Sequence, residues 1–137
     1  MFDRVVVGVT DSARSDAVMD RAMAIVRASR GTLHLVSAFG PHRPPAPAMP
    51  EEFRYSLPMV DPVDYRLGEL KAKASRASIA VVVHPVLSGA VDALTKVARD
   101  EQADLIVVGA KVAHGPGHLG NVPRALMEAA PCAVLVV

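Results

Sequence analysis

With 137 residues, 15 of them basic and 14 acidic, the chain is long enough for one domain with a sizeable core and too short for two ordinary ones, so we expect residues 1–137 to form a single domain. The net charge of +1 and the scattered basic residues exclude the strongly basic surface that a nucleic-acid partner would need. No stretch is long and apolar enough to cross a membrane, no secretory pattern precedes the first apolar run, and the single cysteine excludes an internal disulfide, so we expect a cytoplasmic protein.

The first third of the chain predicts a strand, a helix and a second strand. Residues 5–9 form a continuous β-branched run, which is typical of a strand covered on both faces. Residues 15–29 carry apolar side chains at helical spacing, with acidic residues early and Arg27 late, and Gly31 is expected to cap the helix. Residues 32–39 then read as the second strand.

The segment 40–62 differs from the rest because it contains seven prolines and no helical period. Proline removes a backbone donor and restricts the residue before it, so a long irregular loop is expected here. Loops of this length are either functional covers or disordered segments, and the sequence leaves both readings open.

The remaining elements continue the alternation. We expect helices at residues 64–75 and 89–99, strands at residues 79–83, 105–108 and 133–137, and a last helix that begins at Asn121 and ends before Pro131. Five strands alternating with four helices predict an α/β fold with a parallel, doubly wound sheet and helices on both faces. Ligands bind such sheets at the carboxyl ends of the strands, where the direction of the connections reverses.

Two of these carboxyl ends have the residue types that a binding site needs. Thr10, Asp11 and Ser12 follow the first strand, and a glycine-rich loop links the fourth strand to Asn121. Glycines let backbone N–H groups approach an anion, and the first N–H groups of a helix have no internal partner. If the first and fourth strands are neighbours, the two ends form one pocket. Helix capping alone, and an ordinary loop, are the simpler interpretations of the same residues.

Other reactive residue types have simpler explanations. His114 and His118 are four apart, but the glycines and Pro116 around them make a helical metal site improbable. His34 and His84 fall within or at the end of strands, where partly buried, hydrogen-bonded histidines are common. Cys132 is expected to be an inert apolar residue. No set of residues forms a recognisable catalytic constellation, so no catalytic residue and no metal ligand is assigned.

The whole chain resembles the universal stress protein family. The resemblance is carried by VVVGVTDSARS, LHLVSAF, SGAVDAL, ADLIVVGA, GNVPRAL and APCAVLVV in this order. It implies a Rossmann-like sheet in the strand order 3-2-1-4-5, a homodimer paired through residues 133–137, and, in one branch of the family, ATP with its Mg²⁺ between the ends of strands one and four. The stretch SGAVDAL also resembles a subset of members that bind cyclic AMP.

The resemblance also implies a set of nucleotide-binding positions. These are Val9, Thr10, Asp11, Ser12, Ala38, Phe39, Gly109, Ala110, Val112, Gly115, Gly117, Gly120, Asn121 and Val122. The ATP-binding branch has the loop pattern G-x2-G-x9-G-[ST]. Here Val112 occupies the position of the second glycine, the loop is two residues shorter, and Asn121 replaces Ser or Thr.

Three functions follow as hypotheses. The first is a stress-response sensor that binds an adenine nucleotide, namely ATP, AMP or cyclic AMP. The second is a nucleotide-free dimeric module that binds a protein partner, and the third is a weak ATPase. The contracted loop favours a ligand smaller than ATP, because it has less reach around a triphosphate.

Overall fold

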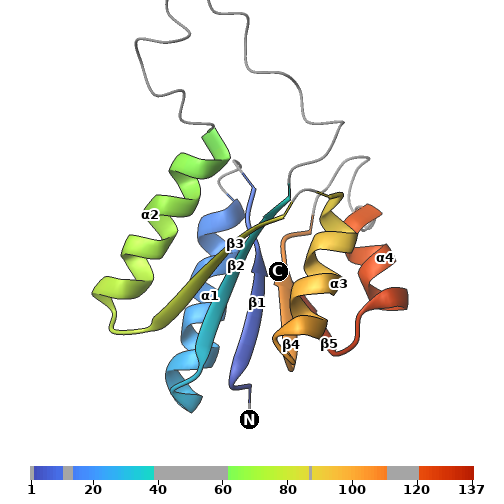
Figure 1. The fold of residues 1–137 in the computed structure, drawn as a ribbon. Coiled ribbons are helices and arrows are strands. Elements are labelled where there is room, and N and C mark those ends of the chain that lie inside the picture. The colour runs from blue at the N-terminus through green and yellow to red at the C-terminus, as the bar shows by residue number, and fades with distance from the viewer. Residues whose placement is uncertain (1, 11–13, 39–61, 87, 111–120) are drawn as a thin grey trace, which may run out of the picture.

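The computed structural model describes residues 2–10, 14–38, 62–86, 88–110 and 121–137. The elements alternate along the chain as strand and helix (Figure 1). They are β1 (Arg4–Gly8), α1 (Arg14–Ser29), β2 (Thr32–Ala38), α2 (Pro62–Arg76), β3 (Ala80–Val86), α3 (Ala90–Asp100), β4 (Leu105–Val108), α4 (Asn121–Ala129) and β5 (Ala133–Val136).

The five strands form one parallel sheet in the order β3-β2-β1-β4-β5, which confirms the predicted fold and strand order. The chain moves outward from β1 to β2 and β3, then returns to the other side of β1 for β4 and β5. The direction of the connections therefore reverses between β1 and β4. This reversal is where a ligand site is expected in a sheet of this kind.

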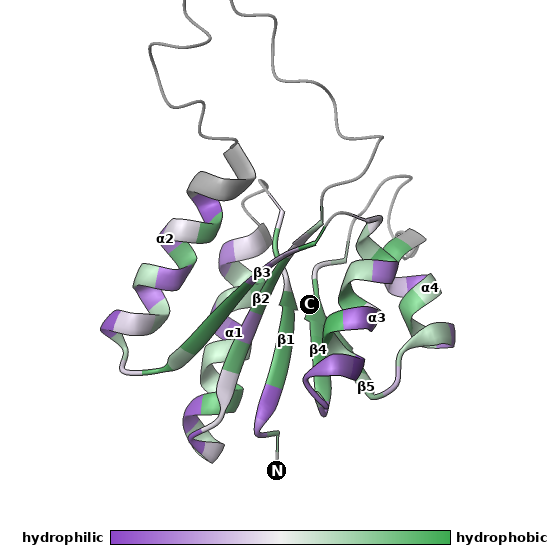
Figure 2. Ribbon diagram, in the orientation of Figure 1, coloured by the Kyte–Doolittle hydropathy of each residue, from purple (hydrophilic) through white to green (hydrophobic). Residues whose placement is uncertain are grey.

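Helices cover both faces of the sheet, α1 and α2 on one and α3 and α4 on the other (Figure 1). In β1, Val5 and Val7 point toward α1 while Val6 points toward α3 and α4, and all three are at most 1% exposed. Burial on both faces explains why the strand is a continuous apolar run (Figure 2). Among the helices described, none combines the length and the apolar character of a membrane span.

The three helices α1, α2 and α3 end in the same way. A residue in the left-handed conformation follows each helix, namely Arg30 at φ 56°, Ser78 at φ 59° and Gln102 at φ 52°. The next N–H group then bonds a carbonyl five residues back, as Gly31 does to Val26 at 3.0 Å. This is the Schellman arrangement. The expectation that Gly31 provides the cap was therefore wrong by one residue, because Arg30 adopts the left-handed conformation.

Gly31 is required for a different reason. A Cβ at this position would lie 2.4 Å from the carbonyl oxygen of Asp3, whose main chain passes directly beside it. The same oxygen accepts a hydrogen bond from the N–H group of Thr32 at 2.8 Å. The glycine thus allows the chain before β1 to approach the start of β2.

Two element boundaries differ from the prediction by more than one residue. Pro62, which was assigned to the irregular segment, is the first residue of α2, because proline needs no hydrogen bond in the first turn of a helix. β3 continues to Val86 and includes His84 and Pro85, which a position at the edge of the sheet tolerates. Residues 40–61 lie outside the described part of the chain, so the two readings of that segment remain predictions.

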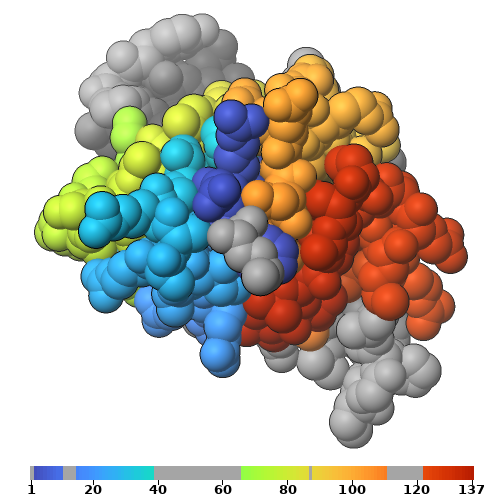
Figure 3. Space-filling model, turned by 90° about the horizontal axis from the view of Figure 1, so that it is seen from below, coloured from blue at the N-terminus to red at the C-terminus, as the bar shows by residue number. Residues whose placement is uncertain are grey.

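The amino ends of the strands are held together by Asp104, just before β4. Its carboxylate accepts hydrogen bonds from the N–H groups of Asp3 at 3.0 Å and Arg4 at 3.1 Å. Figure 3 looks onto this side of the molecule, where the first residues lie between the segments leading to β2 and β4. The Arg4 guanidinium also donates to the carbonyl oxygen of Glu101 at 3.3 Å, which joins β1 to the end of α3.

Candidate functional site

The carboxyl ends of β1 and β4 lie next to each other. The two strands pair in parallel from Val5 opposite Leu105 to Val7 opposite Val107. Val9 and Thr10, which follow β1, therefore lie on the same edge of the sheet as Gly109 and Ala110, which follow β4. The adjacency that the sequence left open is thus present.

The turn after β1 is closed by Ser15 in the first turn of α1. The Ser15 Oγ accepts a hydrogen bond from the Thr10 N–H group at 3.0 Å and donates one to the Thr10 carbonyl oxygen at 2.8 Å. The two side-chain hydroxyl oxygens are 3.2 Å apart, and Ser15 is 3% exposed. Ser15 was not among the predicted site residues, and its hydroxyl group holds the main chain of Thr10.

Main-chain hydrogen bonds occupy some of the predicted donors. The Val9 N–H group donates to the Val36 carbonyl oxygen at 3.0 Å, and the Ala110 N–H group donates to the Val137 carbonyl oxygen at 2.8 Å. These bonds extend the sheet past the assigned strand ends. A ligand at this edge would therefore find the N–H groups of Val9 and Ala110 already used.

The other predicted positions divide into two groups. Ala38 is the last residue of β2, and Asn121 and Val122 begin α4, whose first N–H groups have no partner within the helix. The remaining positions lie outside the described residues, and so do the two loop histidines. They are Asp11, Ser12, Phe39, Val112, Gly115, Gly117 and Gly120, with His114 and His118.

A second group of polar side chains lies on the α3 face of the sheet. The Nδ1 of His34 is 2.9 Å from the Nε2 of His84, so one ring donates a hydrogen bond to the other. His34 is 5% exposed, and this burial lowers its pKa, with a further lowering from His84 and an opposite effect from Glu101. The expectation of partly buried, hydrogen-bonded histidines is confirmed. The sequence did not single out Glu101, since nothing local links it to either histidine.

The comparisons with known proteins agree with this fold. The profile of the universal stress protein family matches residues 1–137. A universal stress protein of Mycobacterium tuberculosis strain H37Rv is 33% identical over 141 residues, which cover 99% of this chain and 96% of that protein.

Several solved structures are similar in fold. A universal stress protein solved in complex with cAMP has a TM-score of 0.75 and 29% identity, covering 99% of this chain and 96% of that one. A family member from Arabidopsis thaliana with AMP bound has a TM-score of 0.72 and 17% identity, and the match covers 98% of this chain and 90% of that one. The profile match over the whole chain, joined to the observed sheet order, shows that this protein belongs to the universal stress protein family.

Proposed function

We propose that this protein is a nucleotide-responsive stress protein that binds an adenine nucleotide with a single phosphate, cyclic AMP or AMP, at the carboxyl ends of β1 and β4. The observation that carries the proposal is the parallel pairing of β1 with β4, which brings Thr10 and Gly109 to one edge at the reversal of the sheet. In this site α4 supplies the positive end of its dipole to the phosphate, and the end of β2 at Ala38 supplies main-chain groups to the base.

The short loop after β4 and one relative both favour a ligand with a single phosphate. The loop between Gly109 and Asn121 is two residues shorter than the ATP-binding pattern and carries Val112 in place of a glycine. A shorter loop surrounds one phosphate more readily than three. The family member solved with cAMP, at 29% identity, supports the same choice.

Isothermal titration calorimetry of the full chain with cyclic AMP, AMP, ATP and cyclic GMP tests the proposal. We expect cyclic AMP or AMP to bind and to raise the melting temperature, because a ligand that binds the folded state stabilises it. ATP should bind more weakly and cyclic GMP least. The absence of heat and of any thermal shift with all the adenine nucleotides at millimolar concentration would refute it.

A pair of glycine variants locates the site. Gly109→Val places a branched side chain at the end of β4, and we expect it to lower nucleotide affinity by about tenfold or more, equivalent to roughly 1.4 kcal/mol. Gly89→Val is the matched control, because Gly89 precedes α3 in an extended conformation and a Cβ there has no atom within 4 Å. Equal affinities of the two variants would place the nucleotide elsewhere.

A nucleotide-free dimeric module is the second candidate, and the edge position of β5 favours it. β5 pairs with β4 on one side, and its residues Val134, Leu135 and Val136 are only partly buried. An apolar edge strand of this kind is a template for pairing with a second chain. Light scattering of the nucleotide-free protein should then give the mass of a dimer, and a monomer at tens of micromolar would exclude this candidate.

A further inference from the structure

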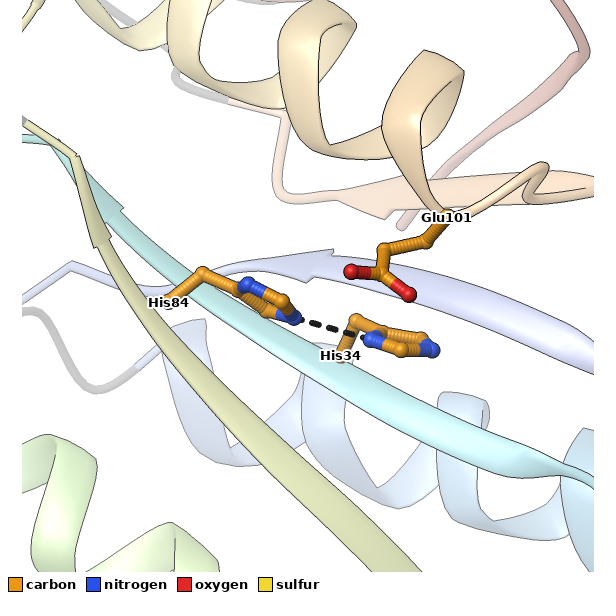
Figure 4. A group of neighbouring side chains, drawn as sticks. All are labelled: His34, His84 and Glu101. Carbon is orange, nitrogen blue, oxygen red and sulfur yellow. Dashed lines mark hydrogen bonds between the residues drawn. The ribbon is translucent and has the colours of Figure 1, made fainter.

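Three side chains from three elements gather on the face of the sheet that α3 covers (Figure 4). They are His34 on β2, His84 on β3 and Glu101, the residue that caps the end of α3. One ligand atom from each lies within 4.8 Å of the other two. We propose that His34, His84 and Glu101 form a binding site for a divalent transition-metal ion, with zinc the best match to the ligand set.

The strand register places the two imidazoles together. His34 lies opposite Val82 and His84 lies opposite Val36, so the two histidines are offset by two residues along neighbouring strands and point to the same face. Their rings are 5.1 Å apart between centroids and tilted by 33°. The facing nitrogens are Nδ1 of His34 and Nε2 of His84, which share one hydrogen bond at 2.9 Å.

The backbone of Glu101 is held from two sides. Its N–H group donates to the Val97 carbonyl oxygen at 2.9 Å, and its own carbonyl oxygen accepts from the Arg4 guanidinium at 3.3 Å. The left-handed residue Gln102 follows at once and turns the chain away from the helix axis. The Glu101 carboxylate is thereby directed toward the two rings, as Figure 4 shows.

The ligand set and its spacing suit zinc. Two imidazole nitrogens and one carboxylate oxygen, with a further position open to water, form a common arrangement for zinc at ligand distances of about 2.0–2.1 Å. In a tetrahedral site those distances separate two nitrogens by roughly 3.3 Å. The two nitrogens, 2.9 Å apart, therefore have to separate by a few tenths of an ångström on metal binding. The three ligand atoms now lie within 4.8 Å of one another, so the Glu101 carboxylate has to move closer to complete the site.

Metal binding needs no net gain or loss of protons, and Glu101 compensates part of the charge. The proton shared between the facing nitrogens moves to the outer nitrogen of its ring, so both imidazoles stay neutral while both facing nitrogens become ligands. The Glu101 carboxylate offsets one of the two charges of the ion. The Arg4 guanidinium near Glu101 opposes a cation, and this weakens the site without blocking any ligand atom.

A groove gives the ion access from solvent. His84 and Glu101 line an open groove of about 920 Å³ between β3 and α3, while His34 lies behind them and is 5% exposed. None of the predicted nucleotide residues is among the described residues that line this groove. The three proposed metal ligands include none of the predicted nucleotide positions, so either proposal can fail without the other.

Titration of the untagged full chain with Zn²⁺ after dialysis against a chelator tests the proposal. We expect one equivalent to bind, and Co²⁺ to give the visible absorption bands of a site with four or five ligands. His84→Gln and Glu101→Gln should each lower zinc affinity by at least about tenfold, because even the loss of a residue that only hydrogen-bonds to a metal ligand lowers affinity by about that factor.

Two control variants exclude other binding modes. Asp100→Asn removes a neighbouring carboxylate that lines the same groove and pairs with Lys96, and it should leave zinc affinity within about twofold. The double variant His114→Gln with His118→Gln removes the two histidines that are four positions apart in the sequence and should also retain binding.

The zinc affinities of the variants show whether the ion binds at His34, His84 and Glu101. Binding that survives both His84→Gln and Glu101→Gln, or that disappears in the His114 and His118 double variant, overturns the proposal. So does the absence of any zinc bound at about 100 µM, which corresponds to a binding free energy weaker than roughly 5.5 kcal/mol. Far-UV circular dichroism of the metal-free variants checks the fold, and Glu101→Gln is the decisive variant because its side chain is only partly buried.

Discussion

Replacing two glycines by alanine should change stability in opposite directions. Gly31 and Gly68 are both next to or within helical segments, and alanine is the better helix former at an unconstrained position. The structure shows that only one of them has room for a Cβ. Gly68 lies on the exposed side of α2 with no atom within 4 Å of the added carbon, whereas the Cβ at Gly31 meets Asp3.

The size of each effect follows from this geometry. At Gly31 the added carbon is 2.4 Å from the Asp3 carbonyl oxygen and 2.8 Å from the carbonyl carbon, so the main chain has to move by roughly 1 Å to restore ordinary contact. Asp3 cannot withdraw freely, because Asp104 holds its N–H group and Thr32 bonds its oxygen. Overpacking costs about 1–3 kcal/mol and a lost hydrogen bond about 1 kcal/mol, so we expect Gly31→Ala to destabilise by about 2–4 kcal/mol.

Gly68→Ala serves as the matched comparison. We expect it to stabilise the protein by about 0.5–1 kcal/mol, because alanine has less conformational freedom to lose in the interior of a helix. Urea unfolding followed by far-UV circular dichroism measures both variants, and unchanged slopes would show that only stability has changed. A loss of less than about 0.5 kcal/mol in Gly31→Ala, or an equal loss in both variants, would refute the reasoning.

Three further variants test other features. Ser78→Gly should stabilise by about 0.5–1 kcal/mol in the same assay, because it relieves the left-handed conformation at an exposed position, and any destabilisation would contradict this. Leu126→Ala should lower the free energy of unfolding by about 2–5 kcal/mol, because Leu126 is fully buried. Met127→Ala, at the exposed neighbouring position, should change it by less than about 0.5 kcal/mol, and equal effects of the two variants would contradict this packing. Burial, and secondarily the Asp104 carboxylate, raises the pKa of the Cys132 thiol. At neutral pH, iodoacetamide should therefore react more slowly with the folded protein than with the urea-unfolded chain, and its reaction with the folded protein should become faster as the pH rises.

The alternation of strands and helices was predictable from the sequence because each element carries a local signal. The apolar run in β1 and the helical spacing in α3 depend only on neighbouring residues. The strand order came from the resemblance to the family and is confirmed by the pairing. The errors arose where two local rules compete, as at Pro62, which can either exclude a helix or begin one.

The helix ends show a second limit of local reasoning. A glycine after a helix is usually the left-handed cap, and Gly31 fits that rule by position. In the structure Arg30 adopts the left-handed conformation, and Gly31 is needed by the main chain of Asp3, 28 residues earlier. The sequence contains no local sign of that contact.

Composition and local pattern by themselves determined that this chain forms an α/β sheet with polar and glycine-rich ends after strands one and four. Local pattern left open which ends are neighbours; the family resemblance implied it through the strand order, and the pairing confirms it. Only the tertiary structure decided which side chains meet, because this depends on strand register and on where α3 ends. The pairing of β1 with β4 brings the strand ends that precede Thr10 and Gly109 side by side, and the β2–β3 register with the cap of α3 brings His34, His84 and Glu101 together. These juxtapositions link residues from about 17 to 100 positions apart, and periodicity over a few residues holds no information on them.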